Sequence, residues 1–77
     1  MGKLQSLKPA EFEKFLLFIG CTFIRQKGSH RIYHQSGLLR PIIIPFHSGD
    51  LPVLVIKNTL RQLNITAEQF LEILTRF

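Results

Sequence analysis

The sequence predicts an α+β domain of the order α-β-β-β-α-α, in which helices cover one face of a three-stranded antiparallel meander. Three observations support this class. The chain opens on an apolar stripe with helical spacing, continues through three short strand-like segments separated by tight turns, and closes on a second amphipathic helical pattern. Its 77 residues contain no linker or repeat, so we expect a single domain over residues 1–77.

The first helix is expected to start near Pro9, because proline suits a first turn, and to stop at Gly20. Its core-facing positions follow the i, i+3, i+4, i+7 pattern and are Phe12, Phe15, Leu16 and Ile19. Leu17 and Phe18 widen this apolar arc. We therefore expect the helix to be buried on more than one side.

Three strands are expected next. They run from Thr22 to Lys27, from Ser29 or His30 to Gln35, and from Arg40 to Phe46. The links between them are short, with turns at Gly28-Ser29 and Ser36-Gly37, which predicts antiparallel neighbours. Pro41 and Pro45 cannot donate ladder hydrogen bonds, so we expect the third strand at an edge of the sheet.

The C-terminal part is expected to hold two helices. The segment from Leu51 to Ile56 has strand propensity yet runs into a helical pattern, and the following helix is expected to start at Asn58 or Thr59. Asn64 is its expected left-handed stop. A capping box then opens the last helix, with Thr66 at the cap and Gln69 three residues later.

The charge balance favours a polyanionic partner. Ten Lys and Arg against five Asp and Glu give a net charge of +5. Residues 19–49 contain no acid but hold all three histidines and four cations, namely Arg25, Lys27, Arg31 and Arg40. One cysteine, Cys21, permits no intramolecular disulfide and is expected to be a small buried residue. No signal peptide or membrane span is apparent, so we expect a cytoplasmic protein.

The histidines His30, His34 and His47 are the natural candidates for acid–base chemistry near neutral pH. On one strand, His30 and His34 share a face but lie roughly 13 Å apart, too far to bind one zinc ion, so we expect no metal site. Ser29 and His30 point to opposite faces of a strand and have no acidic residue near them in sequence. A serine triad is therefore disfavoured, although the fold could still supply an acid.

Cleavage of RNA requires fewer catalytic groups from the protein than a metal site or a serine triad does. The ribose 2′-hydroxyl is a built-in nucleophile, so the protein must move protons and stabilise charge on phosphorus. His30 could transfer the proton, and Arg25, Lys27 and Arg31 could stabilise the charge and hold the RNA. Ser29 is a further candidate RNA contact, and His47 is a candidate helper that follows the third strand. This chemistry needs no cofactor.

Residues 20–33, with the sequence GCTFIRQKGSHRIY, resemble the HicA or YcfA-like toxin family. Members carry Gly-x-x-x, then Arg-Gln-x-Gly-Ser-His and a strand that ends on an aromatic residue. The likeness covers nearly the whole chain and includes IPFH at residues 44–47, TLR at 59–61 and FL at 70–71, similar to the family's Val-Pro-x-His, Gly-Thr-Leu-Arg and Glu-Phe-Leu.

The resemblance implies a fold like the double-stranded RNA-binding domain and an mRNA interferase activity. It also implies a type II toxin–antitoxin pair, with a HicB-like antitoxin as partner and mRNA as substrate. The family's catalytic histidine corresponds to His30. Two departures stand out: the chain is a few residues longer between His47 and Thr59, and Asn58 replaces the usual glycine.

Two other functions remain open from the sequence. A non-catalytic RNA-binding module would use the same basic sheet. A protein-interaction domain would instead use the apolar segment from Leu51 to Ile56.

Overall fold

The computed structural model describes residues 4–47 and 49–76. The elements follow in the order α1 (Pro9–Phe18), β1 (Thr22–Lys27), β2 (His30–His34), β3 (Ile42–Pro45), α2 (Val53–Leu63) and α3 (Ala67–Leu74). This order confirms the α+β prediction. β1 and β3 both pair antiparallel with β2, which places β3 at an edge of the sheet as its prolines predict.

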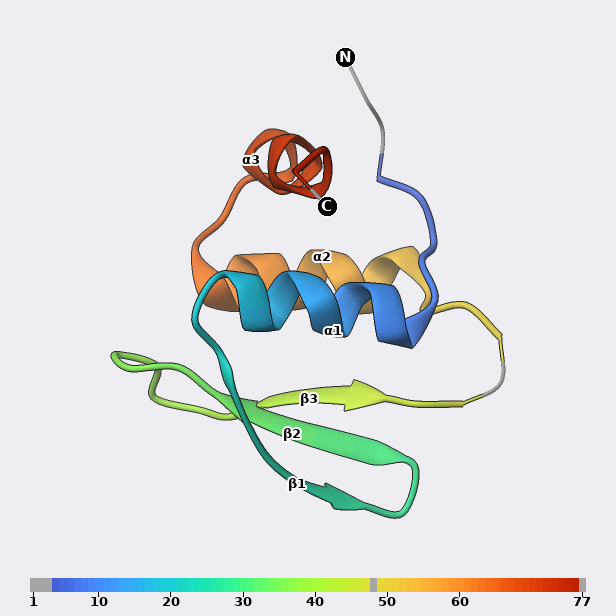
Figure 1. Ribbon diagram of the computed structural model, residues 1–77, viewed down its shortest axis with the longest axis vertical. Helices are drawn as coiled ribbons and strands as arrows, with labels where there is room; N and C mark the ends of the chain where they lie inside the picture. Colours follow the sequence, from blue (N-terminus) through green and yellow to red (C-terminus); the bar gives the residue numbers. More distant parts are fainter. Residues whose placement is uncertain (1–3, 48, 77) are drawn as a thin grey trace.

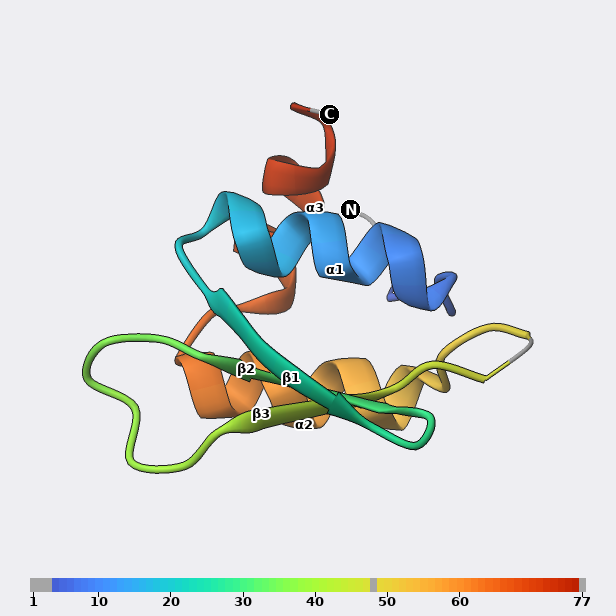
Figure 2. The same ribbon diagram turned by 60° about the horizontal axis from the view of Figure 1, so that its bottom comes forward.

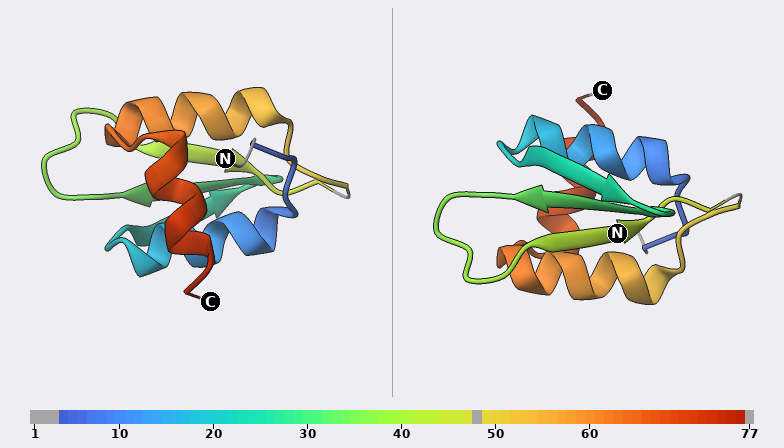
Figure 3. Two further views of the ribbon diagram at one scale, coloured as in Figure 1. Left: turned by 90° about the horizontal axis from the view of Figure 1, so that it is seen from above. Right: turned by 90° about the horizontal axis from the view of Figure 1, so that it is seen from below.

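The helices lie on one face of the sheet (Figure 1). α1 lies over the β1 side, α2 lies over the β3 side, and α3 crosses above both helices (Figures 1 and 3). The other face is turned toward the reader in Figure 3, right, where no described helix stands in front of it. The connection between β2 and β3 projects beyond the sheet (Figure 2). One face of the sheet is therefore left open for a ligand.

The core lies between the sheet and the helices. Phe12 and Phe15 of α1 pack their rings against Phe70 of α3, with centroid distances of 5.8 and 4.6 Å. The sheet contributes fully buried side chains from the face that meets the helices, namely Tyr33, Ile42 and Ile44. Cys21 is buried as expected, and burial raises the pKa of its thiol.

One expectation about α1 is wrong. Leu17 is 49% exposed and Phe18 is 53% exposed, so the helix is not buried on more than one side. α1 meets the sheet and α3 through the stripe that contains Phe12, Phe15 and Leu16. Each residue turns the helix by about 100°, so Leu17 and Phe18 lie beyond the arc that contains Phe12, Phe15 and Leu16.

The expected start of α2 is also wrong, because the helix begins at Val53 instead of Asn58 or Thr59. Pro52 holds the extended conformation before the first turn, and Leu51 pairs with Leu7. β-branched residues cost at most about 0.7 kcal/mol each in a helix. Burial of Ile56 and Leu60 is worth about 1.5–3 kcal/mol for each side chain, so packing outweighs the summed propensity cost.

The ends of α2 and α3 follow the sequence signals. Asn64 adopts the left-handed conformation with φ 61° and ψ 41°, which confirms the predicted stop. The Thr66 hydroxyl accepts a hydrogen bond from the Gln69 N–H at 3.0 Å, and the Gln69 side chain accepts one from the Thr66 N–H at 2.9 Å. The capping box is thus confirmed.

Candidate active site

His30 lies on the open face of the sheet, at the start of β2. Tyr33 of the same strand is fully buried toward the helices. Because strand side chains alternate between faces, His30, Ile32 and His34 belong to the opposite, open face. His30 and His34 are both exposed, so the face is accessible to a ligand at both histidines.

A bulge in β1 brings two cations to the same face. The register pairs Phe23 with Tyr33, Arg25 with Ile32 and Lys27 with His30. Residues that pair across strands share a face, so Arg25 and Lys27 lie on the open face with His30. Ile24 is the extra residue that makes this possible. Strict alternation from the helix-facing Phe23 would have turned both cations away from His30.

Arg31 lies on the other face and is engaged with protein groups. Its Nη1 donates to Glu13 of α1 at 2.8 Å, and its Nε donates to Gln26 at 3.1 Å. The guanidinium also lies over the rings of Phe23 and Phe46, at 5.6 and 4.3 Å from their centroids. The hydrogen bond to Glu13 raises the pKa of Arg31. The structure therefore does not bring Arg31 together with Arg25, Lys27 and His30.

Tyr33 completes this helix-side cluster. Its hydroxyl donates a hydrogen bond to Glu13 at 2.5 Å. Burial, followed by the hydrogen bond and the negative charge of Glu13, raises the pKa of Tyr33 well above its ordinary value. The role of Glu13 was not predicted from the sequence. Glu13 lies 18 residues before Arg31, and no local sequence pattern connects the two residues.

The turn before His30 is built by Gly28 and Ser29. Gly28 has φ +61°, a conformation that other residues rarely adopt. The Ser29 carbonyl accepts a hydrogen bond of 2.5 Å from the Phe46 N–H, just beyond the end of β3. This bond ties the residue before His30 to the residue before His47.

His47 lies beside His30. The centroids of the two imidazole rings are 6.0 Å apart, and the rings meet edge to face at 81°. The two side chains come from different parts of the chain, at the start of β2 and just after β3. Both are exposed, so both can reach a bound molecule.

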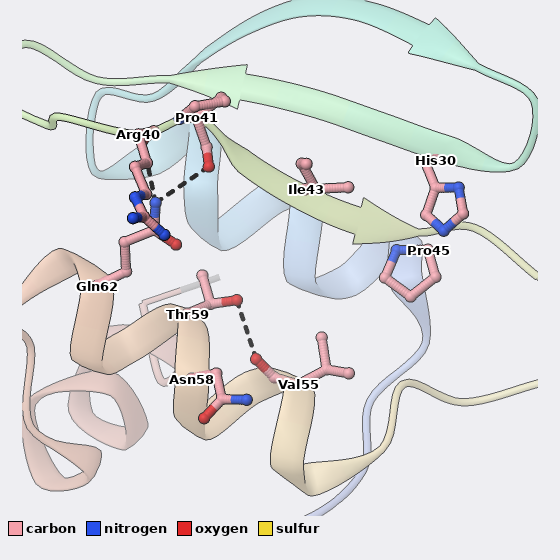
Figure 4. A pocket seen from close by; sticks show the side chains of 9 residues that line it. All are labelled: His30, Arg40, Pro41, Ile43, Pro45, Val55, Asn58, Thr59 and Gln62. Atoms are coloured by element: carbon pink, nitrogen blue, oxygen red, sulfur yellow. Dashed lines mark hydrogen bonds between the residues drawn. The ribbon is translucent and has the colours of Figure 1, made fainter.

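Two hollows meet at His30. One, of about 460 Å³, lies on the open face and is lined by Lys27, Gly28, Ile32 and Ile43 together with His30. The other, of about 570 Å³, runs between β3 and α2 from His30 toward Arg40 and Gln62 (Figure 4). We call the second hollow the β3–α2 groove. None of the described residues that line the two hollows is acidic.

Two general findings apply to the described part of the chain. No group of three or more His, Cys, Asp or Glu side chains is placed where it could hold a metal ion. No helix there is long and apolar enough to cross a membrane.

Fold and site together define a small α+β domain that exposes a histidine opposite Lys27 on the open face of its sheet. The model of a protein family, described as the HicA toxin of bacterial toxin–antitoxin systems, matches residues 9–65. The chain therefore belongs to the HicA toxin family, as the Gly-Ser-His motif predicts. No curated protein sequence matches it. Membership supports a toxin role and pairing with an antitoxin.

Proposed function

We propose that this protein is an endoribonuclease toxin that cleaves mRNA with His30. The observation that carries the proposal is the position of His30. It lies on the open sheet face opposite Lys27, where two hollows meet whose described lining residues include no acidic side chain. A phosphodiester needs such an environment, because its negative charge grows in the transition state and cations stabilise it. His30 transfers a proton as the 2′-hydroxyl attacks phosphorus and the 5′-oxygen departs, and the reaction uses no metal or cofactor.

The remaining residues divide into two groups. Arg25 and Lys27 share the open face with His30 and bind backbone phosphates. Ser29 is partly exposed in the turn before His30 and contacts the same strand of RNA. Arg31 faces Glu13, and we assign it to the architecture of the site instead of to the RNA.

The partner is a HicB-like antitoxin, and the expected place of action is the cytoplasm, where mRNA is available. The excess of positive charge, +5 over the whole chain, suits both RNA and an acidic protein surface. The apolar segment from Leu51 to Ile56 offers the interaction-domain alternative little surface, because Leu51 and Ile56 are buried and the exposed large side chain is that of Leu54.

The test is induced expression in bacteria without the antitoxin. His34→Ala is the matched control, because His34 is an exposed histidine on the same strand and face as His30. Wild type and His34→Ala should arrest growth and cut mRNA, and His30→Ala should do neither. If His30→Ala cuts mRNA as wild type does, the proposal is wrong. If all three proteins bind RNA and none cuts it, the protein is a non-catalytic RNA-binding module.

A further inference from the structure

Cleavage through the 2′-hydroxyl requires two proton transfers. The bond from phosphorus to the 2′-oxygen forms as the bond to the 5′-oxygen breaks. One group takes the proton of the 2′-hydroxyl, and another group gives a proton to the departing 5′-oxygen. The products are a 2′,3′-cyclic phosphate and a free 5′-hydroxyl, and no other reactant is consumed. A single histidine can serve only one of these steps at a time.

We propose that His47 is the second proton-transfer group, and that it works with His30 on one phosphate. The ring centroids lie 6.0 Å apart, so both imidazoles can hydrogen-bond oxygens of the same bound phosphate. The rings meet edge to face and do not stack, and both side chains are exposed. His34 is four residues from His30 on the same strand, so it lies too far along the face to take this role.

The fold fixes the distance between the two histidines. The Phe46 N–H donates to the Ser29 carbonyl, which joins the residues immediately before His47 and His30. The Phe46 ring is covered on one side by the guanidinium of Arg31, which Glu13 holds in turn. The backbone at His47 is thereby anchored to β2 and, through Arg31, to α1.

This inference rests on the proposed function, and the following experiment separates the two. Cleavage of a defined RNA is measured against pH for wild type, His47→Ala and His34→Ala. Wild type and His34→Ala should give the same bell-shaped profile. His47→Ala should still bind RNA but cleave about 100-fold to 10,000-fold more slowly and lose one limb of the bell. If wild type cleaves and His47→Ala matches His34→Ala, His47 has no part; if wild type does not cleave, the proposed function fails.

A second substrate then assigns the two roles. In RNA with sulfur in place of the 5′-oxygen at the cleavage site, the leaving thiolate needs no proton. The variant that lacks the proton donor should recover on this substrate, and the variant that lacks the base should not. Recovery of one of His30→Ala and His47→Ala supports the pair. Equal behaviour of the two variants on both substrates would overturn it.

The β3–α2 groove supports a second inference, which also rests on the proposed function. In an antiparallel ladder, hydrogen-bonded residue pairs alternate with pairs that are not hydrogen-bonded. The hydrogen bond from the Phe46 N–H to the Ser29 carbonyl shows which pairs of β2 and β3 are the bonded ones. The backbone groups of Ile43 and Pro45 consequently point away from β2, toward the groove. Pro45 has no N–H, and the Pro41 carbonyl already accepts from Gln62 at 3.0 Å. A peptide strand would therefore find few partners along this edge.

We infer that the groove binds the base of a nucleotide next to the cleaved phosphate. The groove starts at His30, and Arg40 lies toward its far end, where it can bind the next phosphate (Figure 4). Its wall includes the half-exposed side chain of Ile43, which a flat base can cover. Asn58 of α2 offers both a donor and an acceptor to the edge of a base.

The test is sequencing of the cleaved ends of a random-sequence RNA pool. Wild type should show a base preference at a position flanking the cleavage site, and Asn58→Asp should change it, because a carboxylate accepts but does not donate. Lys57→Gln, next to Asn58 but outside the groove lining, is the control and should leave the preference unchanged. An unchanged preference in Asn58→Asp, or the same change in the control, would overturn the inference. If the wild-type protein does not cleave the RNA pool at all, the proposed function is wrong.

Discussion

The guanidinium of Arg31 lies 4.3 Å from the ring centroid of Phe46, the residue that precedes His47. The same guanidinium donates a hydrogen bond to Glu13 at 2.8 Å. Arg31, although it lies within the basic segment, therefore stabilises the structure of the site through its contacts with Phe46 and Glu13. Lys27, a cation of the same segment, instead lies on the open face opposite His30.

This difference predicts opposite behaviour of two charge-removing substitutions. Lys27→Gln should weaken RNA binding and lower the slope of log affinity against log salt by about 0.7, the value for one single-strand phosphate. Arg31→Gln should leave that slope unchanged and lower the free energy of unfolding, because Glu13 loses its positively charged partner and keeps only the hydrogen bond from Tyr33. Binding titrations over a salt series and urea unfolding measure the two effects. A reduced slope in Arg31→Gln would place Arg31 on the RNA.

Tyr33 should keep its proton at unusually high pH. The chain has one tyrosine and no tryptophan, so absorbance near 295 nm reports Tyr33 alone. In the unfolded chain the phenol should ionise near pH 10, its ordinary value. In the folded protein, burial and Glu13 raise the pKa, so the tyrosinate signal should appear only at higher pH.

The same shift fixes the sign of the pH dependence of stability. Above about pH 10 the unfolded state releases the phenol proton and the folded state keeps it, so the free energy of unfolding falls as pH rises. Tyr33→Phe should remove this part of the decline. It should also cost about 1–3 kcal/mol at neutral pH, because Glu13 loses a hydrogen bond. Native and urea-unfolded titrations that coincide would contradict the account.

Phe70 should be the part of α3 on which stability depends most. Its ring is 1% exposed and packs edge to face on Phe15 at 4.6 Å. Phe70→Ala should lower the free energy of unfolding by about 3–5 kcal/mol. Leu54→Ala is the control, because Leu54 is 66% exposed and its loss should change stability by less than about 0.5 kcal/mol. If urea unfolding shows that the two substitutions lower the free energy of unfolding equally, α3 does not pack on α1.

Local patterns predicted most of the fold. The stripe with Phe12 and Phe15, the left-handed Asn64 and the capping box at Thr66 depend on residues close in sequence, and the structure confirms each. The start of α2 could not be predicted in this way. The β-branched segment before Asn58 becomes helical because the fold buries Ile56.

The site depends more on distant contacts. The Gly-Ser-His motif was sufficient to propose His30 from the sequence. The side of the sheet on which Arg25 and Lys27 lie depends on a bulge at Ile24, which no sequence pattern predicts. The closeness of His47 to His30 follows from the pairing of β2 with β3, which sequence spacing alone does not fix.

Cleavage of a defined RNA by the purified protein, under single-turnover conditions with a chelator present, tests the central claim most directly. Wild type and His34→Ala should cleave at the same rate, and His30→Ala should be slower by about 100-fold or more, since general acid–base catalysis contributes that much. All three should give the same circular dichroism spectrum and still bind RNA. A His30→Ala protein that cleaves at the wild-type rate would contradict the account.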